Sequence, residues 1–180
     1  MTERTPRQFC AVLRGPAGAG KSTLARAVQA ALTAKVAVID TDIFNWQIVP
    51  GEDDKDVVYE NVVSLASAYL KHGYSVIVEG LILTDEERGA IARLREFAAG
   101  EQAAFADCYC SVPKDVALCR AERRERRVSS DKISAWWDLA EADKRNVDRP
   151  LVEIDMTVAV SENVAAVLDE LTRFDKEGAS

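Results

Sequence analysis

The sequence predicts an α/β protein built on a parallel β-sheet with helices on both of its faces. Segments with the pattern of strands alternate with segments with the pattern of helices along nearly the whole chain, which is typical of parallel sheets with right-handed crossovers. The expected strands are short, apolar and rich in β-branched residues, as they are when helices cover both faces. At 180 residues, the chain should form a single domain over residues 1–180.

A complete phosphate-binding motif follows the first expected strand, Phe9–Arg14. The motif G-x-x-x-x-G-K-[ST] occupies Gly15–Ser22, and apolar residues then recur at helical spacing as far as Thr33. A chance match is expected in roughly one per cent of chains of this size or fewer. Backbone N–H groups of such a loop, together with the N-terminus of the following helix, bind phosphate. We therefore expect a nucleoside triphosphate to contact Gly15, Pro16, Ala17, Gly18, Ala19, Gly20, Lys21, Ser22 and Thr23.

Two of these residues have side chains with particular roles. Lys21 should reach the β- and γ-phosphates, and the hydroxyl of Ser22 should ligate Mg²⁺. Arg14, directly before the motif, should face either solvent or an acid.

The next elements follow the same alternation. The second strand is expected at Val36–Asp40, and apolar residues at helical spacing then predict a helix over Asp56–His72 that Gly73 ends. Ser75–Glu79 has the apolar run of a third strand, ending in an acid.

The second half of the chain begins with a capping box, in which Thr84 and Glu87 start a helix that runs to about Ala98. A fourth strand is expected within residues 102–112, and a proline then begins another helix. The remaining predicted elements are the helices Pro113–Arg127 and Asp131–Arg145, the strand Met156–Val160 and the amphipathic helix Glu162–Phe174.

Three carboxylates close the second and third strands. Asp40 and Asp42 are two residues apart and should lie on one side of an extended chain, while Glu79 ends the next strand. Ligands of parallel sheets bind at the carboxyl ends of the strands, so all three should lie near Mg²⁺ and the γ-phosphate. One aspartate could hold the magnesium hydration shell and the other could accept the proton of an attacking hydroxyl. Glu79 could coordinate the metal through water or bind the substrate.

An arginine-rich run predicts a helical lid. Residues 119–127 carry five arginines, and Arg120, Arg124 and Arg127 recur at one helix face. Guanidinium groups suit phosphate oxygens, so the segment of about 120–149 should close over ATP. The alternative is a solvated helix with Glu–Arg pairs.

Composition limits the partners. The net charge of −7 opposes broad nucleic-acid binding, although a small basic site remains compatible with it. No apolar run approaches the roughly 20 residues of a membrane span, and the N-terminus lacks an apolar signal region. The four cysteines show no C-x-x-C spacing and are expected to be buried free thiols. We expect a cytoplasmic protein without a membrane partner.

Together these residues resemble the small P-loop kinases of the nucleoside-monophosphate-kinase-like group. The similarity is greatest to the branch with zeta-toxin-type kinases, chloramphenicol phosphotransferase, gluconate kinase and polynucleotide 5′-kinase. It rests on Gly15–Ser22 as Walker A, Ile39–Asp42, Val76–Gly80, the lid arginines and residues 147–157. No distal Walker B aspartate of the usual Asp-x-x-Gly form follows one of the expected strands.

This resemblance implies a P-loop NTPase three-layer sandwich. The five-stranded parallel sheet should have the order 2-3-1-4-5, with an arginine-rich helical lid and Mg·ATP as phosphate donor. By position, Asp42 would be the general base and Asp40 would lie nearer the metal, with Glu79 in the Walker B region. Lys21, Arg120 and Arg124 would offset charge on the γ-phosphoryl group, and Arg127 would contact the nucleotide.

The sequence therefore predicts an ATP-dependent phosphotransferase that acts on a hydroxyl of a small molecule such as a sugar, a nucleoside-like compound or an antibiotic. The acidic stretch over residues 52–60 slightly favours a neutral or cationic acceptor. Three alternatives stay open: a polynucleotide 5′-hydroxyl kinase, an ATP-binding regulatory switch without a phosphorylated product, and a toxin that phosphorylates a cell-wall precursor. The acceptor and the oligomeric state have no signature in the sequence.

Overall fold

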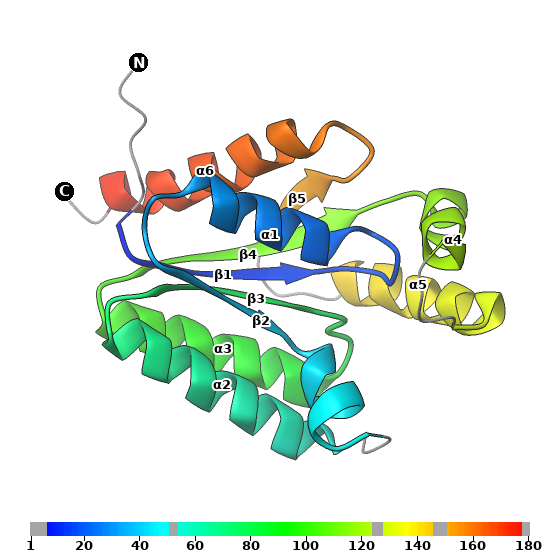
Figure 1. Cartoon of the computed structure of the whole chain (residues 1–180), viewed down its shortest axis with the longest axis horizontal. Coiled ribbons are helices and arrows are strands. Elements are labelled where there is room, and N and C mark those ends of the chain that lie inside the picture. Colours follow the sequence, from blue (N-terminus) through cyan, green and yellow to red (C-terminus); the bar gives the residue numbers. More distant parts are fainter. Residues whose placement is uncertain (1–6, 51–53, 124–127, 146–150, 178–180) are drawn as a thin grey trace.

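A computed structural model of the chain describes residues 7–50, 54–123, 128–145 and 151–177. Its centre is a parallel sheet in the order β2-β3-β1-β4-β5 (Figure 1). The order is the one that the resemblance implied. The strands are β1 (Phe9–Arg14), β2 (Val36–Asp40), β3 (Ser75–Gly80), β4 (Ala104–Ser111) and β5 (Val152–Asp155).

Helices cover both faces of this sheet, as the apolar strands require. One face carries α1 (Lys21–Ala31) and α6 (Val160–Glu177), and the other carries α2 (Lys55–Lys71) and α3 (Asp85–Gly100) (Figure 1). Successive residues of β1 point to opposite faces, so Phe9, Ala11 and Leu13 join the first core while Cys10 and Val12 join the second. The central strand is therefore buried on both sides.

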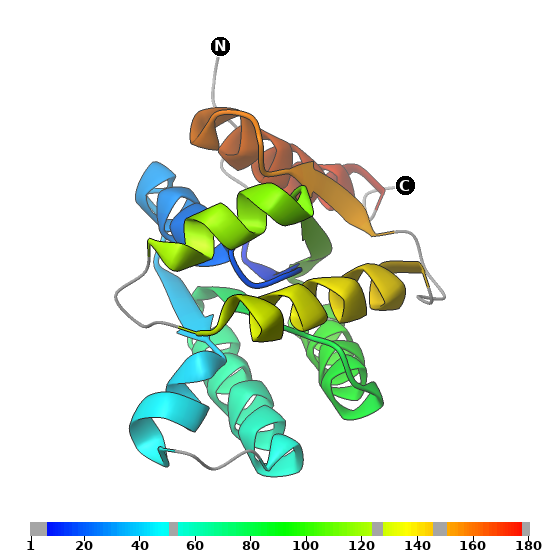
Figure 2. The same ribbon diagram turned by 90° about the vertical axis from the view of Figure 1, so that its right-hand side faces the viewer.

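Two further helices lie at the carboxyl edge of the sheet. Figure 2, which looks onto this edge, shows α4 (Lys114–Glu122) and α5 (Ser130–Arg145) on either side of the loop that follows β1. The two helices pack against one another. The carboxyl edge is thus the part of the molecule where the loop, the helices and the strand ends meet.

The predicted fifth strand, Met156–Val160, is wrong. The strand is β5, whose residues pair with β4 from Val152 beside Cys108 to Asp155 beside Ser111. Asp155 Oδ1 then accepts the N–H of Thr157 at 2.9 Å, a local turn that ends the strand. Val158 and Val160 are 40% and 42% exposed, so β-branched residues that suggested a strand instead lead into α6.

Other boundaries differ by less. The capping box at Thr84 and Glu87 is confirmed, and it precedes α3. The helix predicted over Pro113–Arg127 ends at Glu122 within the described part of the chain, with Arg123 in a turn. Three cysteines are buried as expected, but Cys119 is exposed.

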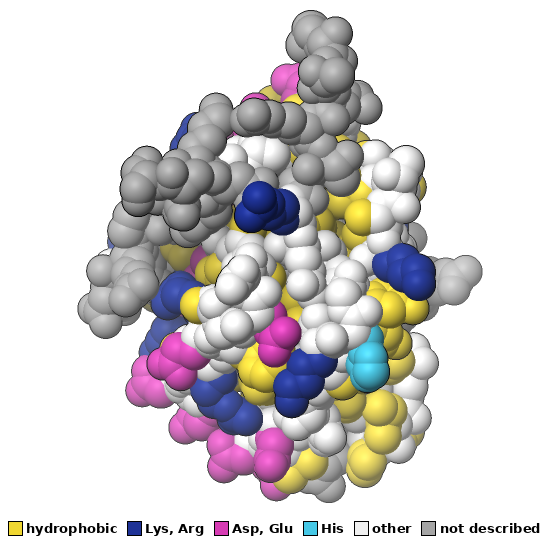
Figure 3. All heavy atoms as spheres, turned by 90° about the vertical axis from the view of Figure 1, so that its left-hand side faces the viewer, with side chains coloured by type: hydrophobic (Ala, Val, Ile, Leu, Met, Phe, Trp, Pro, Cys, Tyr) yellow, Lys and Arg dark blue, Asp and Glu magenta, His cyan; other side chains and the backbone are white. Residues whose placement is uncertain are grey.

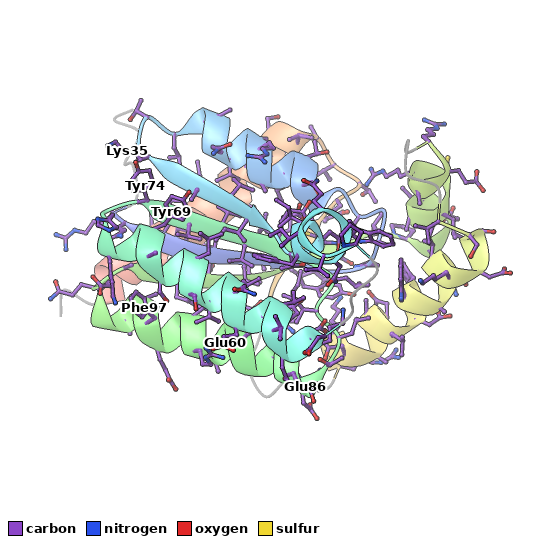
Figure 4. All side chains as sticks on the ribbon, turned by 60° about the horizontal axis from the view of Figure 1, so that its bottom comes forward. Lys35, Glu60, Tyr69, Tyr74, Glu86 and Phe97 are labelled. Carbon is purple, nitrogen blue, oxygen red and sulfur yellow. The ribbon has the colours of Figure 1, made fainter. Side chains whose placement is uncertain are left out.

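The amino ends of the strands form the opposite face of the molecule. Figure 3 shows charged side chains of both signs there, interspersed with hydrophobic ones. The rings of Tyr69 and Tyr74 lie 5.4 Å apart, and the Lys35 ammonium lies 5.3 Å from the Tyr74 ring; Figure 4 shows these residues at the end of the sheet far from α4 and α5. These contacts close the turn between α2 and β3. None of the helices in the described ranges is long and apolar enough to cross a membrane.

Candidate active site

The loop after β1 has the backbone of a phosphate cradle. Gly18 and Gly20 have φ angles of +83° and +101°, which L-residues with side chains rarely adopt. A Cβ atom on Gly18 would also lie 2.3 Å from the carbonyl oxygen of Ala117 in α4. Only glycine therefore allows α4 to pack this closely on the loop.

Lys21 is folded back onto this loop. Its Nζ donates hydrogen bonds to the carbonyl oxygens of Gly15 at 2.9 Å and Pro16 at 3.0 Å, and the side chain is buried. The ammonium group is thus held beside the glycine-rich turn. It lies where phosphate oxygens can replace the carbonyl oxygens as its partners.

The structure brings the three predicted carboxylates to one edge. Asp40 stands beside Glu79 in the register of β2 and β3, and Asp40 Oδ1 accepts the backbone N–H of Asp42 at 2.9 Å. The next residue in β3 is Gly80, and a Cβ there would lie 2.1 Å from Thr41 Oγ1, so a larger residue would displace the Thr41 side chain. Thr41 in turn donates its backbone N–H to the Glu79 carbonyl oxygen at 3.0 Å. The turn that presents Asp42 is therefore pinned against the end of β3.

Glu79 is the most deeply buried acid of this group, with 3% exposure. Burial, and after it the negative charge of Asp40, raises the pKa of the Glu79 carboxyl, while the charge of Lys21 and a hydrogen bond from Ser22 act in the opposite direction. Glu79, Asp40, Lys21 and Ser22 consequently share one electrostatic environment. A cation at this point would relieve the repulsion between the carboxylates.

The donor set is one that suits Mg²⁺. The groups present are carboxylate and hydroxyl oxygens, which Mg²⁺ prefers, and Mg²⁺ usually retains several waters and phosphate oxygens. Among the described residues, no group of three His, Cys, Asp or Glu side chains is arranged to hold a metal ion alone. The residues thus fit a metal that is completed by phosphate oxygens and water.

The predicted lid arginines are only partly described. Arg120 Nη1 donates to the Ala19 carbonyl oxygen at 3.1 Å, and Nη2 donates to the Met156 carbonyl oxygen at 2.9 Å. Its guanidinium group therefore bridges the phosphate-binding loop and the turn after β5. Arg124 and Arg127 lie outside the described residues.

The segment after Asp42 was not singled out from the sequence. It forms a π-helical turn over Phe44–Ile48, with a half-exposed Trp46. The Oδ1 atom of Asn45 in this turn is buried, and it is the one such side-chain oxygen or nitrogen without a hydrogen-bond partner in the described part of the chain. A buried polar atom normally has a partner, so Asn45 Oδ1 is a hydrogen-bond acceptor that the described residues leave unsatisfied. In the sequence, the only feature that could have drawn attention to Asn45 is that it lies three residues after Asp42.

A second feature missed by the sequence analysis is a buried ionic network under the loop. Arg14 is 3% exposed and faces acids: its Nε and Nη2 contact the two carboxylate oxygens of Asp107 at 2.9 and 3.0 Å. Its Nη1 contacts Asp143 Oδ2 in α5 at 3.2 Å. Of the two environments left open for Arg14, the acid is correct. No spacing rule connects residues this far apart in the chain.

Comparison with known proteins shows the family of this chain. The model of the AAA_33 family, described as an AAA domain, matches residues 11–150, which include the phosphate-binding loop, the three carboxylates and α4 and α5. The chain belongs to the AAA_33 family. This agrees with the predicted group of small P-loop proteins.

One curated relative of this AAA_33 chain is an adenylyl-sulfate kinase of Myxococcus xanthus (strain DK1622). The two are 31% identical over 118 residues, and the match spans 62% of this chain and 62% of the relative. The chain thus matches less than two thirds of that protein.

Solved structures show the same fold. A gluconokinase from Sinorhizobium meliloti 1021 has a TM-score of 0.68 at 21% identity, with 97% of each chain covered. The Mycobacterium tuberculosis APS kinase CysC in complex with AMPPNP and APS has a TM-score of 0.67 at 18% identity, covering 93% of this chain and 99% of that chain. At these identities the likeness concerns the fold, which confirms the predicted α/β architecture.

Proposed function

We propose that this protein is an ATP-dependent kinase that transfers the γ-phosphoryl group of Mg·ATP to a hydroxyl of a small molecule. The observation that supports this most is the meeting of a phosphate cradle, Lys21 and three carboxylates at one edge of the sheet. ATPases that only switch conformation need the cradle and the metal. A further aspartate at the end of β2 suits an acceptor whose proton must be removed.

The donor binds on the loop Gly15–Ser22 and Thr23. Lys21 exchanges its two carbonyl partners for phosphate oxygens and offsets their charge. The Ser22 hydroxyl, with Asp40 or Glu79, would hold Mg²⁺, which would neutralise charge at the β- and γ-phosphates. Arg120, Arg124 and Arg127 complete the positive surroundings of the nucleotide, with Arg120 already anchored against the loop.

Asp42 acts as the general base. The acceptor oxygen forms the new bond to the γ-phosphorus as the bond from that phosphorus to the β–γ bridging oxygen breaks, and the acceptor proton passes to the Asp42 carboxylate. ADP leaves with the electron pair of the broken bond. Asp40 supports this role because its Oδ1 holds the backbone of Asp42 in place.

The acceptor lies beside the turn that follows Asp42. Asn45 Oδ1 offers a buried hydrogen-bond acceptor, which suits a hydroxyl or an amine, and Trp46 offers a ring that binds apolar or cationic groups. The carboxylates Asp40, Asp42 and Glu79 disfavour an anion at this point. A neutral or cationic acceptor therefore fits better than the anions after which the named relatives are called, adenylyl sulfate and gluconate.

The test is phosphorylation of a panel of sugars, nucleosides, amino alcohols, antibiotics and oligonucleotides with γ-labelled ATP. Asp42→Asn should lower turnover of the accepted compound by about 10²–10⁴-fold while ATP affinity stays within twofold, because the substitution removes the base and not the cradle. Lys21→Ala should abolish both binding and turnover.

Other results would redirect the proposal. Near-normal turnover by Asp42→Asn would rule this residue out as the base. Label on oligonucleotide ends alone would identify a polynucleotide kinase. ATP hydrolysis without any labelled product would favour a switch.

A further inference from the structure

A single carboxylate of α5 joins three elements of the fold. Asp143 is 4% exposed, and its two oxygens have different partners. Oδ2 accepts from Nη1 of Arg14, the last residue of β1, and Oδ1 accepts from Nη1 of Arg88 in α3. Because Arg14 directly precedes Gly15, Asp143 connects α5 to the start of the phosphate-binding loop.

Arg14 does not depend on Asp143 alone. Both carboxylate oxygens of Asp107 in β4 accept hydrogen bonds from the same guanidinium group, from Nε at 2.9 Å and from Nη2 at 3.0 Å. Arg88 also contacts Asp85 in α3, so the linked network holds two arginines and three aspartates. A neutral residue at position 143 therefore leaves Arg14 paired, and the sheet beneath the loop keeps its bidentate contact.

Helix α5 is also connected to the loop indirectly, because it packs against α4, which contacts the loop. The two helices pack together, and the Ala117 carbonyl of α4 lies close over Gly18. Figure 2 shows the loop passing between them. The position of α5 can thus affect the phosphate-binding loop in two ways, through its packing on α4 and through the contact of Asp143 with Arg14. Only the second is an ion pair with a defined geometry.

Other contacts of α5 hold the helix on the sheet and do not involve the loop. Trp137 Nε1 donates to the Val112 carbonyl oxygen at 3.0 Å, and the Tyr109 hydroxyl donates to Glu141 Oε1 at 2.9 Å. Ile133 and Ala140 are buried beneath the helix. These contacts keep α5 attached to β4 when the charge at position 143 is lost.

We propose that Asp143 is a positioning residue for nucleotide binding, which sets α5 and, through Arg14, the start of the phosphate-binding loop in the geometry that Mg·ATP requires. Buried ion pairs contribute little net stability compared with apolar packing, but their geometry is specific. Asp143 acts through Arg14 and does not touch the nucleotide. The inference rests on the proposed function to the extent that the loop binds Mg·ATP.

The experiment compares Asp143→Asn with the wild type in two measurements. Calorimetric titration with Mg·AMPPNP should give a Kd about tenfold higher for the variant, which corresponds to about 1.4 kcal/mol. Amide hydrogen exchange without ligand should be faster across α5 in the variant and unchanged in β1. Asp138→Asn is the matched control, because Asp138 lies in the same helix and pairs with Lys114 but is 61% exposed; its Kd and its exchange should equal those of the wild type.

Two results would overturn the proposal, and a third would separate it from the proposed reaction. A lower unfolding temperature of Asp143→Asn with an unchanged Kd would show that the network only stabilises the fold. Equal effects of Asp138→Asn and Asp143→Asn would show that the loss of any carboxylate from α5 weakens binding, whatever contacts that carboxylate makes. A wild type that binds Mg·AMPPNP but phosphorylates nothing would contradict the proposed reaction and leave this inference intact.

A second variant covers the case in which Asp143→Asn does not fold. Arg88→Met removes one partner of Asp143 and leaves its contact with Arg14. We expect a Kd for Mg·AMPPNP about threefold above the wild type, with faster exchange in α5. An unchanged Kd and unchanged exchange in Arg88→Met would contradict the proposal.

Discussion

Glu79 is a buried carboxylate whose charged form is disfavoured in the folded chain. Its carboxylate is buried beside Asp40 at the edge where Mg²⁺ is proposed to bind, and burial raises its pKa. A carboxyl with a higher pKa in the folded chain than in the unfolded chain binds protons more tightly when folded. The free energy of unfolding from this group is therefore greatest at low pH and falls as the pH rises through the folded pKa.

Glu79→Gln should remove the destabilisation that comes from burying a charged carboxylate beside Asp40. At pH 7 and in EDTA, we expect the variant to be more stable than the wild type, because the amide carries no charge to bury beside Asp40. The amide keeps the shape and can still accept from Ser22. Urea unfolding at pH 7 and pH 4 measures the difference, which should shrink at the lower pH, because a carboxyl with a raised pKa takes up its proton in the folded chain as the pH falls. A wild type that is the more stable protein at pH 7 would contradict the assignment. Turnover should fall, because a proposed magnesium ligand is lost.

At the scale of elements, the loop and α4 depend on glycine at one contact. Gly18 combines a φ of +83° with a carbonyl oxygen of Ala117 only 2.3 Å from the position of a Cβ atom. A side chain there strains the loop and pushes α4 away from it. The packing of α4 is therefore part of the phosphate cradle, a relation that the motif does not reveal because Ala117 lies far along the chain.

Gly18→Ala should weaken Mg·AMPPNP binding at least tenfold and destabilise the chain by about 1–3 kcal/mol. Gly89→Ala is the matched control, since Gly89 lies within α3 and a Cβ there meets nothing within 4 Å. The control should bind normally and be about 1 kcal/mol more stable, because alanine favours helix. Titration calorimetry and urea unfolding measure both. Normal binding by Gly18→Ala would show that the loop tolerates the displacement.

For the whole molecule, binding at the carboxyl edge should stabilise all of the packed elements together. The sheet carries a core on each face, and α4 and α5 close its carboxyl edge. A ligand that binds only the folded chain shifts its unfolding equilibrium by mass action. The nucleotide should therefore act as a global stabiliser.

Mg·AMPPNP at one hundred times its Kd should raise the free energy of unfolding by about 2.7 kcal/mol. For a chain of this size, this corresponds to a rise of about 5–11 °C in the unfolding temperature. Differential scanning fluorimetry measures it, with AMPPNP in EDTA as the control for the metal. Lys21→Ala should show no rise. The same rise in Lys21→Ala would place the nucleotide elsewhere.

Much of the fold followed from patterns within short segments. The strands β1, β2 and β3 and the capping box of α3 were predicted to within one residue, because local periodicity and capping chemistry decide them. The fifth strand was misplaced because Met156–Val160 has the composition of a strand, whereas the turn at Asp155 and pairing with β4 decide where a strand ends. The composition of a segment does not show which strand it pairs with.

Motif spacing and strand direction are enough to identify the phosphate-binding loop and to place Asp40, Asp42 and Glu79 at strand ends. Three features follow instead from the packing of the folded chain: the burial of Glu79 beside Asp40, the unpartnered oxygen of Asn45, and the pairing of Arg14 with Asp107 and Asp143. These contacts join residues of separate elements. Their energy depends on burial and on distances of about 3 Å, which the packing of the whole chain creates.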